Sequence, residues 1–145
     1  MQHGVTIGKA SERSSVKVPT IRYYEEIGLL PSLERTDGNR RLYSEADVSR
    51  LTFIRHAREL GFELDAIRTL LHLQDEPAQP CADADAIAKA RLEEVRQRIV
   101  SLRALEDELQ RMVEGCSHGR VETCRVIEIL ADHGECRFHE PARAA

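Results

Sequence analysis

The sequence predicts a mainly α-helical protein in which two short helices and a small β-hairpin come first and one long helix dominates the second half. Aromatic residues make up only 4% of the 145 residues and charged residues make up 32%, a balance that favours solvent-rich helices over a large compact core. The segment between Cys81 and Cys116 holds no proline, and its only glycine is Gly115. This segment therefore predicts one uninterrupted amphipathic helix.

Two short helices are expected near the N-terminus. Residues 6–13 begin at an N-capping threonine, and residues 17–27 hold Pro19 in their first turn and end at Gly28. Residues 14–15 form the tight turn between the two helices. Such a pair makes a candidate helix-turn-helix.

A β-hairpin is expected next, because Asp37-Gly38 is a turn signal between segments that could pair. The hairpin would form a wing that carries Arg35, Arg40 and Arg41. Six arginines stand against three acids between positions 35 and 58, whereas the segment after position 75 carries ten basic and fourteen acidic residues and therefore the whole net charge of −4. A basic N-terminal face on an acidic chain is compatible with DNA binding.

Two further helices complete the N-terminal half. Ser44 and Asp47 form a capping box that opens a helix closed by Gly61, and residues 63–73 form the next helix. Residues 75–80 (DEPAQP) then break the chain with two prolines. The expected parts are a winged helix-turn-helix DNA-binding domain over 1–75, a dimerisation helix over 81–115, and a metal-binding loop, short helix and tail over 116–145.

The long helix carries an apolar stripe at coiled-coil spacing, interrupted by Glu106. The stripe consists of Ala88, Leu92, Val95, Ile99, Leu102, Leu109 and Val113. Little apolar sequence remains to cover it, so we expect an antiparallel coiled-coil homodimer. At 1.5 Å rise per residue the helix holds Cys81 and Cys116 of one chain about 50 Å apart, so only two antiparallel copies would bring these cysteines together.

No apolar run has the length of a membrane span, and the N-terminus lacks the basic and apolar regions of a signal peptide. A cytoplasmic location is the default expectation. In a reducing compartment the four cysteines are expected to be metal ligands or redox thiols rather than disulfides.

Two runs of sequence resemble the mercury-resistance regulator (MerR) family of transcription factors: TIRYYEEIGLLP at 20–31 and RRLYSEADVSRLTFIRHARELGFELDAIRTLL at 40–71. The resemblance implies a winged helix-turn-helix, an antiparallel coiled-coil dimer and an effector-binding segment at the far end. It also implies promoter DNA as the partner, with RNA polymerase affected indirectly through distortion of that DNA. The chain departs from the family at Ser15, where the turn usually holds glycine, and at 37–41, where the wing usually has Asn-Gly-Tyr-Arg.

A recognition helix enters the major groove with its N-terminal side chains toward the base edges. Here those side chains are Thr20, Arg22 and Tyr23, and Arg22 suits a phosphate or a guanine edge. The resemblance also implies contacts to the DNA backbone from the wing region and the following helix, made by Arg35, Arg40, Arg41, Tyr43 and Arg58.

Cysteine thiolates are ligands for soft metal ions. Cys116 and Cys124 stand eight positions apart around a glycine-containing loop that could fold both sulfurs onto one ion. Cys81 of the partner subunit would supply a third thiolate. The offset of 35 between Cys81 and Cys116 resembles the zinc, cadmium, lead and mercury sensors of the family. Copper(I) sensors share the loop spacing but typically have serine in place of Cys81.

Further ligands could come from the loop and the tail. His118 lies inside the loop, Cys136 and His139 stand three apart near the C-terminus, and His133 is a weaker candidate. A third thiolate favours a divalent ion over linear copper(I). Zinc, cadmium and lead are the preferred inducers, and mercury also suits the thiolates.

The expected function is metal-dependent activation of an efflux or resistance promoter. The alternatives are an iron–sulfur redox regulator of the same architecture and a copper(I) sensor. An iron–sulfur cluster needs four closely grouped thiolates. A multidrug-type regulator would need a larger effector domain than the short segment after the long helix. Catalysis is not expected, because no paired carboxylates, Ser/His/Asp set or HExxH motif occurs.

Overall fold

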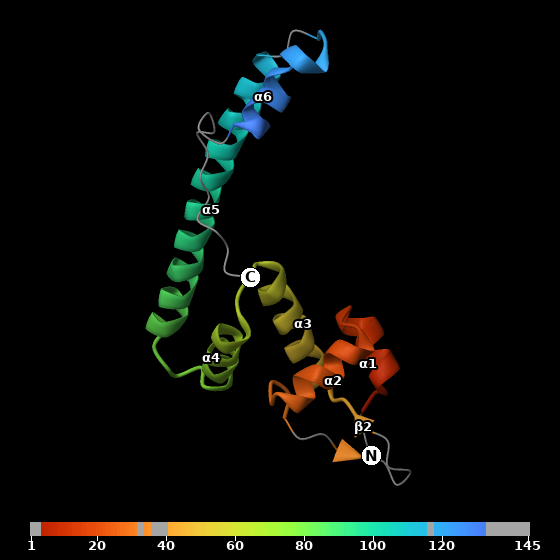
Figure 1. The fold of residues 1–145 in the computed structure, drawn as a ribbon. Helices are drawn as coiled ribbons and strands as arrows, with labels where there is room; N and C mark the ends of the chain where they lie inside the picture. The colour runs from red at the N-terminus through yellow and green to blue at the C-terminus, as the bar shows by residue number, and fades with distance from the viewer. Residues whose placement is uncertain (1–3, 32–33, 36–40, 116–117, 133–145) are drawn as a thin grey trace. The chain divides into compact units, whose positions relative to one another are not determined.

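The computed structural model describes residues 4–31, 34–35, 41–115 and 118–132. The chain forms two compact units, Met1–Arg91 and Leu92–Ala145. Helices make up most of both units, as Figure 1 shows, which confirms the predicted fold class. The predicted domain ranges 1–75, 81–115 and 116–145 remain predictions.

The helix-turn-helix consists of α1 (Ile7–Ser14) and α2 (Val18–Glu26). The side chain of Thr6 caps α1 by accepting a hydrogen bond from the N–H of Lys9, as expected for an N-cap threonine. The helix ends at Ser15, whose φ of 62° lies in the left-handed region. The turn thus keeps the backbone conformation that favours glycine, although a serine occupies it.

The neighbouring Ser14 holds this turn together with its side chain. Its Oγ donates to the carbonyl of Ala10 at 2.7 Å and accepts from the N–H of Val16 at 3.2 Å. Because Ser14 is buried, both of these hydrogen bonds are needed to satisfy its hydroxyl group.

The wing is a two-stranded antiparallel sheet of β1 (Glu34–Arg35) and β2 (Arg41–Leu42), which confirms the predicted hairpin. Residues 36–40, which include the expected turn, lie outside the described residues. Directly after β2, Tyr43 exchanges two backbone hydrogen bonds of 2.8 Å with Val5. The base of the wing is therefore tied to the segment that precedes α1.

Two longer helices follow, α3 (Glu45–Glu59) and α4 (Leu64–Asp75). The predicted capping box is confirmed: the N–H of Asp47 donates to Ser44 Oγ at 3.1 Å, and the N–H of Ser44 donates to Asp47 Oδ2 at 2.8 Å. Gly61, with φ +85°, turns the chain after α3 as expected.

A hydrophobic core lies between the helices and the base of the wing. Its largest fully buried apolar side chains are Ile21, Leu29, Tyr43, Leu51, Ile54, Ile67 and Leu71. Burial of each leucine or isoleucine contributes about 1.5–3 kcal/mol. The core therefore packs α2 and the base of the wing against the other helices of the first unit.

Arginines from α3 and α4 cap the C-terminal end of α2. The guanidinium of Arg50 donates to the carbonyl of Leu29 at 3.1 Å and pairs with Asp75, and Arg68 donates to the carbonyl of Ile27 at 2.8 Å. Positive charge at a helix C-terminus is favourable because the exposed carbonyls are partly negative. These bonds hold α2 against the two longer helices.

The long helix α5 (Ala82–Glu114) is continuous over 33 residues, followed by the 3₁₀ turn η1 (Val121–Thr123) and by α6 (Arg125–Ala131). A helix of this length spans about 50 Å. Among the helices that the structure describes, none has both the length and the apolar composition needed to cross a membrane.

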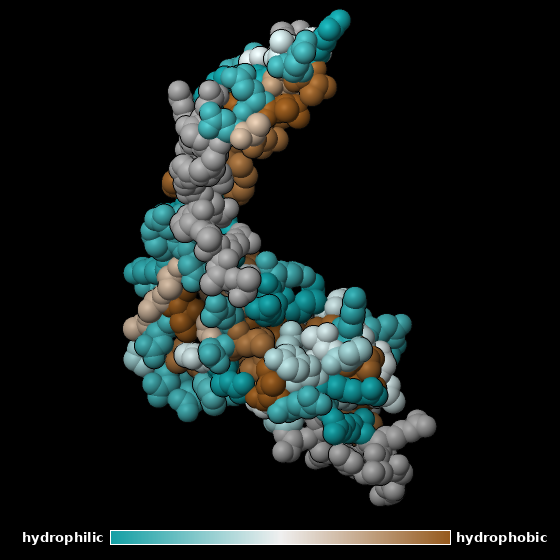
Figure 2. Space-filling model, in the orientation of Figure 1, coloured by the Kyte–Doolittle hydropathy of each residue, from teal (hydrophilic) through white to brown (hydrophobic). Residues whose placement is uncertain are grey.

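Much of the predicted stripe on α5 is exposed in the single chain. Leu102, Leu109 and Val113 each present more than half of their surface to solvent. Figure 2 shows hydrophobic surface, in brown, along the part of α5 that belongs to the second unit. An apolar helix face of this extent is typical of a surface that another chain covers.

Candidate functional site

The first half of α2 presents the side chains that the sequence predicted for a recognition helix. Arg22 and Tyr23 are exposed, and Thr20 is half-buried. Ile21 and Tyr24, on the opposite side, are buried in the core. The alternation leaves one polar face of α2 open to a ligand while the other face fixes the helix.

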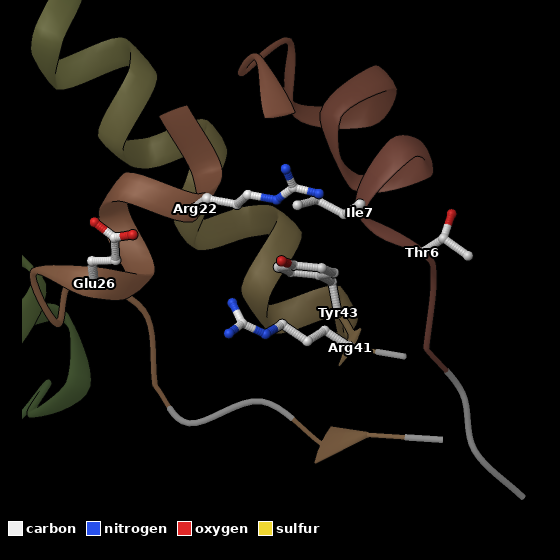
Figure 3. Close-up of a pocket in the computed structure, with 6 residues that line it drawn as sticks. All are labelled: Thr6, Ile7, Arg22, Glu26, Arg41 and Tyr43. Atoms are coloured by element: carbon white, nitrogen blue, oxygen red, sulfur yellow. The ribbon is translucent and has the colours of Figure 1, made fainter. Parts of the chain in front are cut away.

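A cavity of about 490 Å³ opens between the start of α1, the helix α2 and the strand β2 (Figure 3). It is lined by Thr6, Ile7, Arg22, Glu26, Arg41 and Tyr43. In Figure 3 the ring of Tyr43 is drawn between the side chains of Arg22 and Arg41. Two predicted DNA-contacting arginines, from the recognition helix and from the wing, thus share one cavity.

A carboxylate of α2 connects Arg41 with Tyr43. Glu25 accepts a hydrogen bond from the guanidinium of Arg41 at Oε2 and a second one from the hydroxyl of Tyr43 at Oε1. Tyr43 is fully buried, and burial raises the pKa of its hydroxyl group, while the positive charges of Arg41 and Arg22 oppose this rise. The hydroxyl therefore stays protonated and remains a donor to Glu25.

The other predicted DNA contacts occupy different surroundings. Arg58, near the end of α3, donates to the carbonyl of Phe62 at 2.9 Å. Its charge also lowers the pKa of Tyr24, although burial raises that pKa more strongly. Arg35 belongs to β1, and Arg40 lies outside the described residues.

The described candidate metal ligands lie at both ends of α5 and beyond it. Cys81 is an exposed thiol directly before α5, and its carbonyl accepts the N–H of Asp85 at 3.0 Å. Cys124 is a half-buried thiol directly before α6. His118 is exposed and has a φ of 56°.

Three predicted ligands, Cys116, Cys136 and His139, lie outside the described residues, as does the weaker candidate His133. Within the part of the chain that the structure describes, no three cysteine, histidine, aspartate or glutamate side chains form a metal-binding group.

The two ends of the segment between α5 and α6 are close to each other. A Cβ placed on Gly115 would lie 2.6 Å from Cγ and 3.2 Å from Cβ of Arg125. Gly115 precedes Cys116 and Arg125 follows Cys124, so this contact brings together the chain positions beside both cysteines. Thiol donors at such a loop fit a soft metal ion, whereas hard ions prefer oxygen ligands.

Fold and site together define a winged helix-turn-helix protein with a cavity lined by two arginines and a cysteine-flanked segment beyond a long helix. Models of two protein families match the chain: a MerR helix-turn-helix regulatory protein over residues 5–74, and a MerR DNA-binding region over residues 48–112. The chain belongs to the MerR family of helix-turn-helix regulatory proteins.

Individual relatives match along most of their length. The helix-turn-helix transcriptional regulator ZntR of Escherichia coli is 41% identical over 128 residues, which is 86% of this chain and 90% of the relative. The mercuric resistance operon regulatory protein of Serratia marcescens is 40% identical over 135 residues, covering 92% of each chain. The crystal structure of the regulator PbrR691 from Ralstonia metallidurans, in complex with lead(II), superposes with a TM-score of 0.75 at 38% identity, over 87% of this chain and 98% of that one.

Sequence reasoning missed Glu25 and the role of Gly115. Glu25 is one of two consecutive acids on a polar helix, and its partners in the wing follow more than fifteen positions later, so no local pattern identifies it. For Gly115 a signal existed, since a glycine at the end of a helix can mark a place where another part of the chain comes close.

Proposed function

We propose that this protein is a metal-responsive transcriptional regulator that binds promoter DNA as a homodimer and activates a metal efflux or resistance promoter. The relatives include a mercuric resistance operon regulator and a regulator crystallised with lead(II), both matching over most of their length. A cytoplasmic, reducing compartment would keep the cysteines as thiols.

In this proposal α2 enters the major groove and the wing contacts the DNA backbone. Arg22 and Tyr23 on the exposed face of α2 would reach base edges or phosphates. Arg41, together with Arg35 and Arg40 of the wing, would contact phosphates, which position the protein without specifying sequence. Arg58 would add a backbone contact through the guanidinium N–H groups that Phe62 does not use.

The observation that carries the metal proposal is the contact between Gly115 and Arg125 at the base of the loop. It supports a site in which Cys116 and Cys124 act together. Cys81 lies at the other end of α5, about 50 Å along the helix, so the third thiolate is proposed to be Cys81 of the partner subunit. His118, Cys136 and His139 are proposed as additional ligands.

The proposed partner surface is the apolar stripe on α5. Exposed leucines and valines along a helix of 33 residues need a second apolar surface, and an antiparallel copy of α5 provides one of the same length. This arrangement would also place each loop beside the partner's Cys81.

Metal binding would couple to DNA through α5. Arg91, in the third turn of α5, donates from Nε to the carbonyl of Leu60 at 2.9 Å, at the end of α3. A shift of α5 in the dimer would therefore move the DNA-binding helices, and the DNA would be distorted into a form that RNA polymerase can use.

The function is tested by in vitro transcription from a promoter that the protein protects in a DNA footprint. Zinc, cadmium, lead, mercury and copper(I) are each titrated into the reduced protein. We expect activation by one or more divalent ions and loss of activation in Cys124→Ser. Full activation in Cys124→Ser, or activation by copper(I) alone, would contradict the proposed site. A brown, iron-containing protein after anaerobic purification would favour an iron–sulfur regulator instead.

A further inference from the structure

Glu25 is a nearly buried carboxylate on the recognition helix that reaches the wing. Its side chain is 9% exposed, and both of its oxygens are used: Oε2 accepts from Arg41, and Oε1 accepts from Tyr43. A carboxylate in such a place is stable only when paired and hydrogen-bonded. Both of these partners belong to the wing strand or to the residue just after it.

We propose that Glu25 is a positioning residue for DNA binding, which fixes the wing against α2 so that both contact one duplex in register. This role rests on the proposed DNA-binding function. In this role Glu25 does not contact DNA itself and acts through Arg41 and Tyr43.

The geometry of Arg41 supports this role. Its side chain is 44% exposed, and one of its guanidinium nitrogens is bonded to Glu25. A guanidinium has five N–H donors, so the exposed part can still bind a phosphate. An arginine held in advance by one carboxylate loses less conformational freedom when it binds.

Tyr43 provides the second attachment. Its side chain is fully buried, its hydroxyl binds Glu25, and its backbone pairs with Val5. The strand is thus held from α2 on one side and from the N-terminal segment on the other. Loss of the carboxylate would leave the buried hydroxyl without its acceptor.

An effect of charge alone and a positioning role predict opposite changes in DNA affinity when Glu25 is lost. A negative group close to the DNA-facing arginines opposes binding to phosphates, so its removal should tighten binding to any duplex. If Glu25 positions the wing, its removal should instead weaken binding to the preferred duplex. The direction of the change therefore separates the two explanations.

The test compares Glu25→Gln with Glu26→Gln. Glu26 is the next residue, is exposed, and lines the cavity that Arg41 and Tyr43 also line, so its replacement makes the same charge change while the hydrogen bonds of Glu25 to Arg41 and Tyr43 stay in place. For each full-length protein, Kd is measured for a duplex that the wild type selects from a random library and for a scrambled duplex of equal length. We expect Glu25→Gln to bind the selected duplex on the order of tenfold more weakly, with no loss on the scrambled duplex. Glu26→Gln should keep the wild-type ratio of the two Kd values.

Tighter binding of both duplexes by Glu25→Gln would overturn the proposal. Tyr43→Phe removes one of the two hydrogen bonds without a change of charge, and it carries the test if Glu25→Gln does not fold. It should show a smaller loss on the selected duplex only, and wild-type affinity for both duplexes would contradict the role. A wild-type protein that selects no duplex would instead refute the DNA-binding function on which the role rests.

Discussion

Gly115, directly after α5, lies against Arg125, the first residue of α6: a Cβ on Gly115 would be 2.6 Å from Cγ of Arg125. The carbonyl of Arg111 is also within 3.3 Å of that position. A side chain at position 115 would force Arg125 to shift. Glycine therefore allows the two ends of the loop to meet beside Cys116 and Cys124.

Gly115→Ala should weaken metal binding roughly tenfold, because the new methyl group forces Arg125, the first residue of α6, to shift. Metal affinity is measured by competition with a chromophoric chelator. The double variant Gly115→Ala/Arg125→Ala removes the Cγ that the new methyl group meets, and it should recover part of the affinity. Wild-type affinity in the single variant would show that the contact does not position the loop.

Ser15→Gly should stabilise the protein by about 1 kcal/mol, because glycine adopts the φ of 62° without the steric cost that serine bears. Urea unfolding of the two proteins measures the difference. Ser14→Gly is the matched control: it removes the hydrogen bonds to Ala10 and Val16 and should destabilise the protein. Equal stability of Ser15→Gly and the wild type would mean that the turn carries no strain.

Gly61→Ala should destabilise the protein by about 1–2 kcal/mol, because alanine disfavours φ +85°. The new methyl group would also meet the guanidinium of Arg91 at 2.0 Å. Urea unfolding of Gly61→Ala and of Gly61→Ala/Arg91→Ala separates the two causes. If crowding by Arg91 contributes, the double variant loses less than the sum of the two single variants.

The contribution of Glu45 to stability should depend on pH. Arg13 donates two hydrogen bonds to its carboxylate, at 2.7 Å and 2.6 Å, and these bonds hold the pKa of Glu45 below its ordinary value. A lowered folded-state pKa gives a stabilisation that is present above the unfolded-state pKa and is lost as the pH falls through the folded-state pKa. The stability difference between the wild type and Glu45→Gln should therefore shrink on acidification. Urea midpoints across the acidic range measure this difference, and a constant difference would contradict the pair.

Local rules predicted most of the fold. The Ser44–Asp47 capping box and the turn glycine Gly61 specify helix boundaries through residues a few positions apart, and the proline-free segment after Cys81 specifies one continuous helix. Such signals need no knowledge of tertiary structure, so α1 to α5 and the hairpin could be predicted from the sequence alone. The pairing of α5 with a second copy depends on surfaces of another chain, and it remains a prediction.

The candidate site was less predictable, because its residues act through partners distant in the chain. The sequence predicts that Tyr43 contacts DNA, which stays a prediction; the structure shows that its ring is buried and that its hydroxyl binds Glu25. Arg58 was expected at a phosphate, and it also bonds the carbonyl of Phe62. A sequence pattern identifies which residues carry charge, whereas the tertiary fold decides which of those charges are already paired.

Thiolates from two chains are proposed to hold one metal ion, and mixed dimers test this shared site. Cys81→Ser and Cys116→Ser chains are co-expressed with different affinity tags, and the mixed dimer is isolated by purification on both tags in sequence. If each site combines Cys81 of one chain with Cys116 of the other, the mixed dimer retains one intact site, because both wild-type cysteines meet there. We predict that it binds about half the metal of the wild type, while each homodimeric variant loses the tight site. A mixed dimer that binds no more metal than the two homodimeric variants would contradict the account.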